Sequence, residues 1–110
     1  MTAQYACDVS DLGPEEVKAI DLTAADGSVV EVAVVRDSEG GWHAINDVCT
    51  HGAVNLSDGE VEGCLIECWL HGSTFDLNSG EPTTPPASSP VDVYPVTISG
   101  EQVLVDVDGN

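Results

Sequence analysis

A chain of 110 residues suffices for one compact domain and not for two. Its 20 acidic residues against 2 basic ones give a formal net charge of −18, which nearly excludes binding to nucleic acids or to anionic membranes, because both need a basic patch. The same charge is typical of a protein whose partner presents a basic docking face, or of a highly soluble surface in a salt-rich cytoplasm.

Residues 1–12 contain neither a basic stretch nor an apolar segment, so we expect no secretory signal. No run of residues approaches the roughly 18 apolar positions that a membrane helix needs. We therefore expect a cytoplasmic protein with no membrane association. In that compartment the four cysteines are expected to be metal ligands or buried thiols and not disulfides.

Alternating valine-rich stretches separated by glycine-containing turns predict an antiparallel all-β sandwich, formed by one domain that spans residues 1–110. The clearest alternation places Val30, Val32 and Val34 on one face of a strand. A single helical turn is expected at 13–16. The other expected strands are 42–45, 64–67, 96–98 and 103–107, the last two joined by a turn at 99–101.

Residues 81–90 carry four prolines among threonines and serines. They cannot form a central strand, because proline lacks the N–H that a strand ladder needs. Either a stiff surface loop or a rigid lid over a nearby site is expected there.

Two short motifs combine cysteine with histidine. They are Cys49-Thr50-His51 and Cys68-Trp69-Leu70-His71, with 16 residues between them. Each motif offers one thiolate and one imidazole, and each follows an expected strand, where a loop can turn its side chains inward. The sequence therefore predicts a site built from Cys49, His51, Cys68 and His71.

Three chemistries compete for these four residues. A structural zinc site accepts two cysteines and two histidines, but zinc motifs usually pair Cys with Cys and His with His along the chain. Nucleophilic catalysis by a Cys–His pair would use one motif and leave the other without a role. A [2Fe–2S] cluster in which two histidines replace two cysteines on one iron uses both motifs, and the alternating order favours it.

The arrangement resembles the Rieske iron–sulfur family, whose signature is Cys-x-His and Cys-x-x-His separated by a spacer of about this length. The resemblance extends to Phe75-Asp76 and Ser79-Gly80, and it covers most of the chain. It implies a Rieske-type β-sandwich with a small inserted cluster-binding subdomain at about 47–86, which holds one [2Fe–2S] cluster on the two cysteines and two histidines. The proline-rich segment, including Pro85, then occupies the place of the family's cluster-covering loop.

Departures from the family pattern concern the surroundings of the cluster. Ser73 matches a family serine that can donate a hydrogen bond to a bridging sulfide, whereas Phe75 stands where high-potential members have a tyrosine hydroxyl. The cysteines that form a disulfide in those members correspond to Val54 and Leu70. With a donor missing, we expect a potential near the lower end of the Rieske range, about −150 mV. Trp69, where proline is usual, is interpreted as a further backbone donor, a docking anchor, or ordinary packing at the loop base.

Three residues with metal-binding side chains fall outside the two motifs. Cys7 and Cys64 are expected to be buried thiols, Cys64 on a strand. His43 is expected to be a surface or packing histidine, because no neighbouring motif makes a site with it.

The resemblance implies a one-electron carrier and not an enzyme. Its closest kin are the soluble Rieske ferredoxins of ring-hydroxylating dioxygenase systems, which take electrons from a flavin reductase and pass them to a terminal oxygenase. One alternative is a Rieske ferredoxin accessory to iron–sulfur cluster assembly, which the run from Glu67 to His71 also resembles. A nitrite reductase small subunit would share the fold but usually lacks the four ligands, and a structural zinc domain is the remaining alternative.

Overall fold

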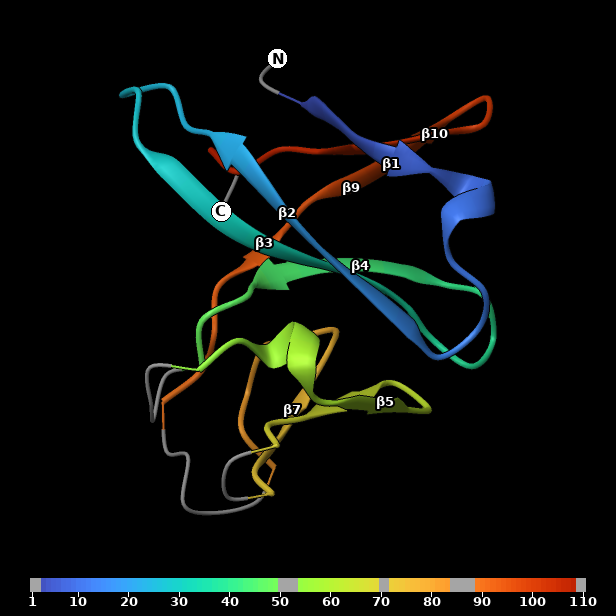
Figure 1. Ribbon diagram of the computed structural model, residues 1–110, viewed down its shortest axis with the longest axis vertical. Helices are drawn as coiled ribbons and strands as arrows, with labels where there is room; N and C mark the ends of the chain where they lie inside the picture. Colours follow the sequence, from blue (N-terminus) through green and yellow to red (C-terminus); the bar gives the residue numbers. More distant parts are fainter. Residues whose placement is uncertain (1–2, 50–53, 70–71, 84–88, 109–110) are drawn as a thin grey trace.

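The structure, a computed structural model, describes residues 3–49, 54–69, 72–83 and 89–108. Its described strands form three sheets, arranged from top to bottom in Figure 1. The first contains β1 (Gln4–Asp8), β10 (Gln102–Val105) and β9 (Val96–Ser99), in that order. The second contains β2 (Glu16–Thr23), β3 (Val29–Arg36), β4 (Trp42–Asn46) and β8 (Val93–Tyr94). The third contains β5 (Glu60–Glu62), β6 (Leu65–Glu67) and β7 (Thr74–Asp76).

Every strand pairing among the described residues is antiparallel, which confirms the predicted all-β architecture. The strands expected at 42–45, 64–67 and 96–98 correspond to β4, β6 and β9. The strand expected at 103–107 corresponds to β10, and Val103, Val105 and Val107 are all buried. Side chains two residues apart on a strand share a face, so this valine series lines one wall of a core.

The segment expected to form a helical turn, 13–16, is instead a turn that leads into β2. Glu15 has a φ of 60°, and its N–H donates to the carbonyl of Arg36 on β3 at 2.8 Å. This hydrogen bond extends the ladder between β2 and β3, so the backbone joins the sheet and does not close a helical turn. The prediction was therefore wrong, and the helical turn near this end of the chain is η1 (Val9–Asp11).

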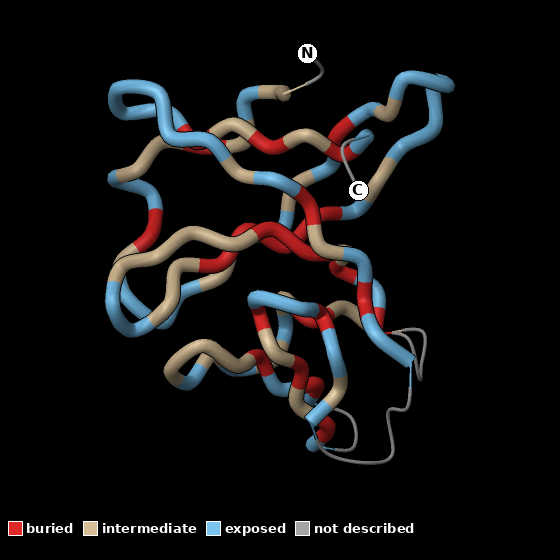
Figure 2. The backbone as a smooth tube through the Cα atoms, turned by 180° about the vertical axis from the view of Figure 1, so that it is seen from behind, coloured by how far each residue is buried: buried red, intermediate tan, exposed pale blue. Residues whose placement is uncertain are grey.

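Strand β3 lies between two hydrophobic cores. Val30, Val32 and Val34 face the core shared with the first sheet, as the alternation predicted. Ala33 and Val35, on the opposite face, are equally buried and belong to a second core. Figure 2 shows a band of buried segments, in red, across the middle of the molecule. A strand that is covered on both faces is thus the common wall of both cores.

The second core fixes the third sheet to the rest of the molecule. Ile66 on β6 and Phe75 on β7 are fully buried, and they pack in one cluster with Ile45 on β4. Cys49 and Cys68 belong to the same cluster. Burying a side chain of the size of phenylalanine stabilises a fold by about 2 to 3 kcal/mol, so the short third sheet is held mainly by this packing.

The helical segments that the structure describes are short. Both η1 and η2 (Leu56–Asp58) are 3-10 helices of three residues. Among the described residues there is no helix of the length and hydrophobicity that crossing a bilayer requires.

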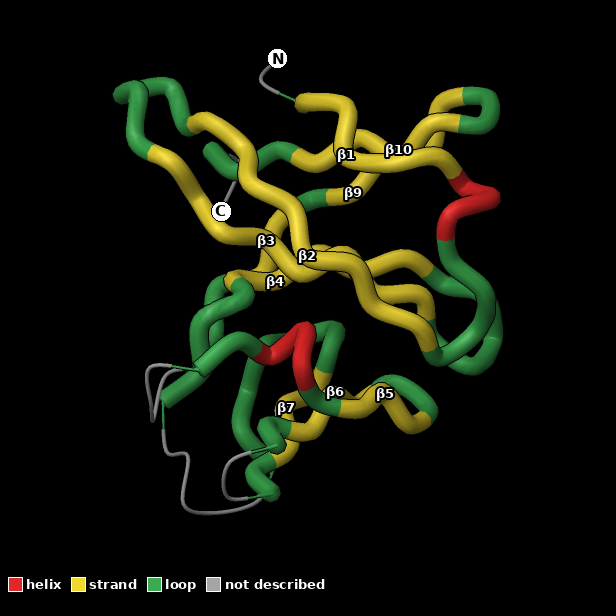
Figure 3. The backbone as a smooth tube through the Cα atoms, viewed as in Figure 1, coloured by secondary structure: helices red, strands yellow, loops and turns green. Residues whose placement is uncertain are grey.

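A buried carboxylate, Asp47, ties η2 to the end of β4. Figure 3 shows η2 as the red segment between the second and third sheets. It is 1% exposed and accepts hydrogen bonds from the Ser57 N–H at 2.7 Å and the Ser57 hydroxyl at 2.9 Å. The Asn55 side-chain amide donates to it at 2.7 Å. The Leu56 N–H also donates to the carbonyl of Asp47, at 2.6 Å. Residues on both sides of the segment 48–54 are therefore fastened together.

We predict that Asp47→Ala lowers the free energy of unfolding by about 2 kcal/mol, because partly buried donors on Ser57 and Asn55 lose their acceptor. The control is Asp92→Ala, which removes an exposed carboxylate and should change stability by less than about 0.5 kcal/mol. Urea denaturation of the two variants and the parent protein measures the difference. Equal stability of the two variants would show that the Asp47 network does not hold the fold.

Candidate metal centre

The first cysteine loop starts at the end of β4 and is closed at its base. The Cys49 N–H donates to the Val54 carbonyl at 2.9 Å, and Val48 pairs with Asn55 in an isolated antiparallel bridge. The Cys49 residue is only 3% exposed. Backbone hydrogen bonds thus hold this cysteine at the inner end of its loop.

The second cysteine loop joins β6 to β7 and is built in the same way. The Cys68 N–H donates to the Ser73 carbonyl at 2.7 Å, and the Gly72 N–H donates back to the Cys68 carbonyl at 3.0 Å. Gly72 has a φ of 74°, a conformation that glycine adopts without the steric cost of a side chain. Cys68 is fully buried, so both loops present a cysteine to the interior.

The structure brings the two predicted cysteine ligands into one buried cluster, together with Leu56, Ile66 and Phe75. None of the four cysteines, all of which lie in the described part of the chain, forms a disulfide. The predicted ligands His51 and His71 lie outside the described residues, as does Pro85. Two buried thiols in hydrogen-bonded loops fit an iron–sulfur cluster, because thiolates are the ligands that iron–sulfur clusters take and a buried thiolate needs a positive charge beside it.

The other residues expected near the cluster differ in exposure. Ser73 and Phe75 are fully buried, in keeping with a position in the wall of the site. Trp69 is 54% exposed, so about half of its surface is open to solvent, and the three interpretations of this residue stay predictions. It lies in the turn directly after Cys68, where its large side chain remains in contact with solvent.

An acidic hollow adjoins the second loop. It is lined by Asp58, Gly59, Glu60, Glu67 and Trp69. Glu60 and Glu67 are directly opposite each other in the β5–β6 pair, and both are exposed. Like charges in such a cross-strand pair destabilise a sheet, so this pair is not explained by the stability of the fold.

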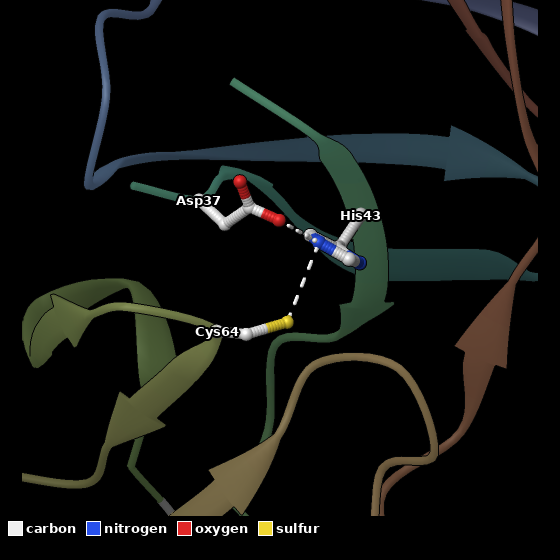
Figure 4. Close-up of side chains that lie close together, drawn as sticks. All are labelled: Asp37, His43 and Cys64. Atoms are coloured by element: carbon white, nitrogen blue, oxygen red, sulfur yellow. Dashed lines mark hydrogen bonds and ion pairs between the residues drawn. The ribbon is translucent and has the colours of Figure 1, made fainter. Parts of the chain in front are cut away.

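The structure also brings together three residues that the sequence analysis left apart. His43 on β4 lies 2.8 Å from Asp37, measured between Nε2 and Oδ2, and 3.7 Å from the sulfur of Cys64 (Figure 4). The partial burial of His43 fits the expected packing histidine. The expectation for Cys64 was wrong, because this thiol is only partly buried and lies in the turn between β5 and β6, not on a strand. No motif could have revealed the contact with Cys64, because 21 positions separate the two residues and only the docking of the third sheet brings them together.

The ionisation of this group follows from its contacts. The hydrogen bond from His43 lowers the pKa of Asp37, and the backbone N–H of Gly41 lowers it further. Burial raises the pKa of the Cys64 thiol, and the carboxylates of Asp37 and Asp76 raise it further. At neutral pH the group therefore contains a carboxylate and a protonated thiol.

Comparison with known proteins places the chain in a family. The family model of the Rieske [2Fe-2S] domain matches residues 2–95. The biphenyl dioxygenase ferredoxin subunit of Pseudomonas sp. (strain KKS102) is 36% identical over 107 residues, covering 96% of this chain and 93% of that protein. The ferredoxin of carbazole 1,9a-dioxygenase from Nocardioides aromaticivorans IC177 is 34% identical with a TM-score of 0.85, over 96% of this chain and 98% of that one.

A third similar structure is a complex of reduced oxygenase and oxidized ferredoxin in carbazole 1,9a-dioxygenase. The matched chain is 31% identical with a TM-score of 0.82, over 93% of this chain and 99% of that one. These similarities extend over nearly the whole chain and confirm the resemblance drawn from the two motifs. The chain belongs to the Rieske [2Fe–2S] family, and its cofactor is a [2Fe–2S] cluster of the Rieske type, bound by cysteine and histidine.

Proposed function

We propose that this chain is the electron carrier of a ring-hydroxylating dioxygenase system, receiving single electrons from a flavin reductase and delivering them to a terminal oxygenase in the cytoplasm. The observation that carries the proposal is the pair of buried cysteines at the bases of two hydrogen-bonded loops, Cys49 and Cys68. The names of the similar proteins support the choice of system, since they are ferredoxins of dioxygenases.

The proposed ligands are Cys49, His51, Cys68 and His71, within a single Rieske domain of residues 1–110 and a cluster-binding subdomain of about 47–86. When bound, the cluster supplies one-electron oxidation and reduction. Backbone hydrogen bonds hold the bases of the two ligand loops, which limits the movement of Cys49 and Cys68 when the cluster changes its oxidation state. The apolar core behind the cysteines excludes water from that side of the site.

Ser73 and Phe75 set the polarity around the ligands in this proposal. The buried Ser73 supplies a hydroxyl, whereas Phe75 supplies none. Hydrogen bonds to cluster sulfur stabilise the reduced, more negative form and raise the potential. A midpoint near −150 mV, about the lower end of the Rieske range, thus remains a prediction that a redox titration measures.

The oxygenase is proposed to dock on the surface next to the cysteine loops. Val48 and Trp69, each adjacent in sequence to one of the two cysteines, are among the exposed large hydrophobic residues at 38% and 54%. The acidic hollow beside Trp69 adds Glu60 and Glu67. An apolar centre bordered by one sign of charge is typical of a site that attracts a basic partner face and then excludes water on contact.

The ligand assignment predicts that Cys49→Ser and Cys68→Ser each abolish the cluster. The matched control is Cys7→Ser, since Cys7 is also buried but belongs to the core on the other side of β3. Iron analysis and visible absorption of the purified proteins measure the outcome. The parent and Cys7→Ser should hold about two irons per chain. A parent protein that is colourless and holds zinc would contradict the proposal, as would a Cys68→Ser variant with a full cluster.

The docking surface predicts that Glu67→Gln slows the second-order transfer of electrons to the oxygenase by about threefold at low ionic strength. The effect should disappear at high salt, because the attraction between exposed charges is screened. The matched control is Glu101→Gln, which removes the same charge from the turn between β9 and β10, at the far end of the molecule in Figure 1. Stopped-flow mixing of reduced ferredoxin with oxidised oxygenase gives both rates. Equal slowing by the two variants would place the docking surface elsewhere.

A further inference from the structure

The group formed by Asp37, His43 and Cys64 has the geometry of a metal site. Asp37 follows β3, His43 lies on β4 and Cys64 lies in the turn between β5 and β6. Their candidate ligand atoms, one from each side chain, all lie within 4.8 Å of one another. Figure 4 shows the three side chains pointing toward a common centre, and all three are partly buried.

The carboxylate and the sulfur both face the same ring nitrogen of His43. If Nε2 carries a proton, that proton is shared between Oδ2 of Asp37 and the weakly accepting sulfur of Cys64. If Nε2 carries none, the carboxylate of Asp37 faces a lone pair. A catalytic Cys–His–Asp triad would instead use both ring nitrogens, one for the acid and one for the nucleophile. A cation at the centre accepts electron pairs from all three atoms.

We propose that Asp37, His43 and Cys64 bind one Zn²⁺ ion at a second metal site, separate from the cluster loops. Tetrahedral zinc, with bonds of about 2.1 Å to nitrogen and oxygen and about 2.3 Å to sulfur, separates its N and O ligands by about 3.4 Å and its N and S ligands by about 3.6 Å. The separation of 3.7 Å between His43 and Cys64 matches the zinc geometry. The separation of 2.8 Å between His43 and Asp37 is that of a hydrogen bond and has to lengthen by about 0.6 Å when the ion enters. One thiolate, one imidazole and one carboxylate suit zinc better than magnesium or calcium, which prefer oxygen alone.

The carboxylate of Asp37 is oriented by the turn in which it lies. Its other oxygen, Oδ1, accepts the N–H of Glu39 at 2.9 Å and the N–H of Gly41 at 2.8 Å. These two bonds leave Oδ2 directed at His43. A metal ligand that is held in place by backbone donors loses little freedom on binding, which strengthens the site.

Hydrogen bonds also hold Cys64 in place. The Leu77 N–H donates to its carbonyl at 2.9 Å, and the preceding residue, Gly63, donates its N–H to the Glu15 carboxylate at 2.9 Å. The Asn78 side chain donates to the sulfur itself at 3.2 Å. An outer hydrogen bond of this kind is what metal-bound thiolates usually receive.

Binding at this site joins two sheets. Zinc would connect the β3–β4 turn and β4 of the second sheet with the β5–β6 turn of the third sheet. The cluster cysteine Cys68 directly follows β6 of that third sheet. On binding, the S–H bond of Cys64 breaks, its proton leaves to solvent and a sulfur–zinc bond forms, while the ring proton of His43 resides on Nδ1. The three protein ligands leave a fourth position for water. The ion would act as a structural cross-link between the two sheets and stabilise the folded protein.

Calorimetric titration of Zn²⁺ into the cluster-loaded protein tests the proposal. We expect one tight site per chain, which Cys64→Ser weakens at least 100-fold and Asp37→Asn at least tenfold. Cys7→Ser is the matched control and should bind zinc as the parent does. Cluster absorption recorded before each titration shows that the variant is folded and that the cluster loops are occupied.

Co²⁺ provides an independent readout, because a bound thiolate gives a sulfur-to-cobalt charge-transfer band in the difference spectrum against the cluster-loaded protein. That band should appear in the parent and in Cys7→Ser and be absent from Cys64→Ser. Zinc should also raise the melting temperature of the parent and of Asp92→Asn but not of Asp37→Asn, which keeps the test valid if Cys64→Ser does not fold. Equal zinc affinity of the parent and the site variants, or no charge-transfer band, would overturn the proposal.

Discussion

The third sheet cannot fold alone, and this constraint governs the structure. Each of its strands, β5, β6 and β7, has only three residues, too few to bury a core between themselves. Its stability comes from the cluster that Ile66 and Phe75 form with Ile45 and with the second face of β3. Because Cys49 and Cys68 are part of that cluster, the packing that stabilises the sheet also positions the two cysteines.

Function follows from this shared core. A one-electron carrier works best when its ligands move little between oxidation states, and here each cysteine lies at the base of a loop closed by backbone hydrogen bonds. The core covers the inner side of the site, whereas Val48 and Trp69 next to the cysteines are exposed. The site therefore has a buried, apolar inner wall and an exposed outer surface on which a partner can dock.

Patterns confined to a few residues were predictable from the sequence. The alternation at Val30, Val32 and Val34 needs only the period of two along a strand, and the two Cys/His motifs each span four residues or fewer. The turn at 99–101 is equally local, because it joins two neighbouring strands. These features identified the fold class and the family. The positions of His51 and His71 lie outside the described residues, so the full ligand set stays a prediction.

Features that depend on distant pairing were not predictable. The expected helical turn at 13–16 failed because the N–H of Glu15 donates across the sheet to Arg36, a bond that no local pattern reveals. The burial of Ala33 and Val35 depends on the docking of the third sheet on β3. The contact between His43 and Cys64 has the same origin. The two short Cys/His motifs thus predicted the cluster site, whereas the proposed zinc site depends on the packing of the third sheet against the second.

The account depends most on a cluster bound by two cysteines and two histidines. The most direct test is the low-temperature EPR spectrum of the purified protein after reduction by dithionite. The account predicts a signal with the low average g-value of a histidine-ligated [2Fe–2S] centre. A signal with the higher average g-value of a cluster held by cysteines alone, or no iron signal from a colourless protein, would contradict it.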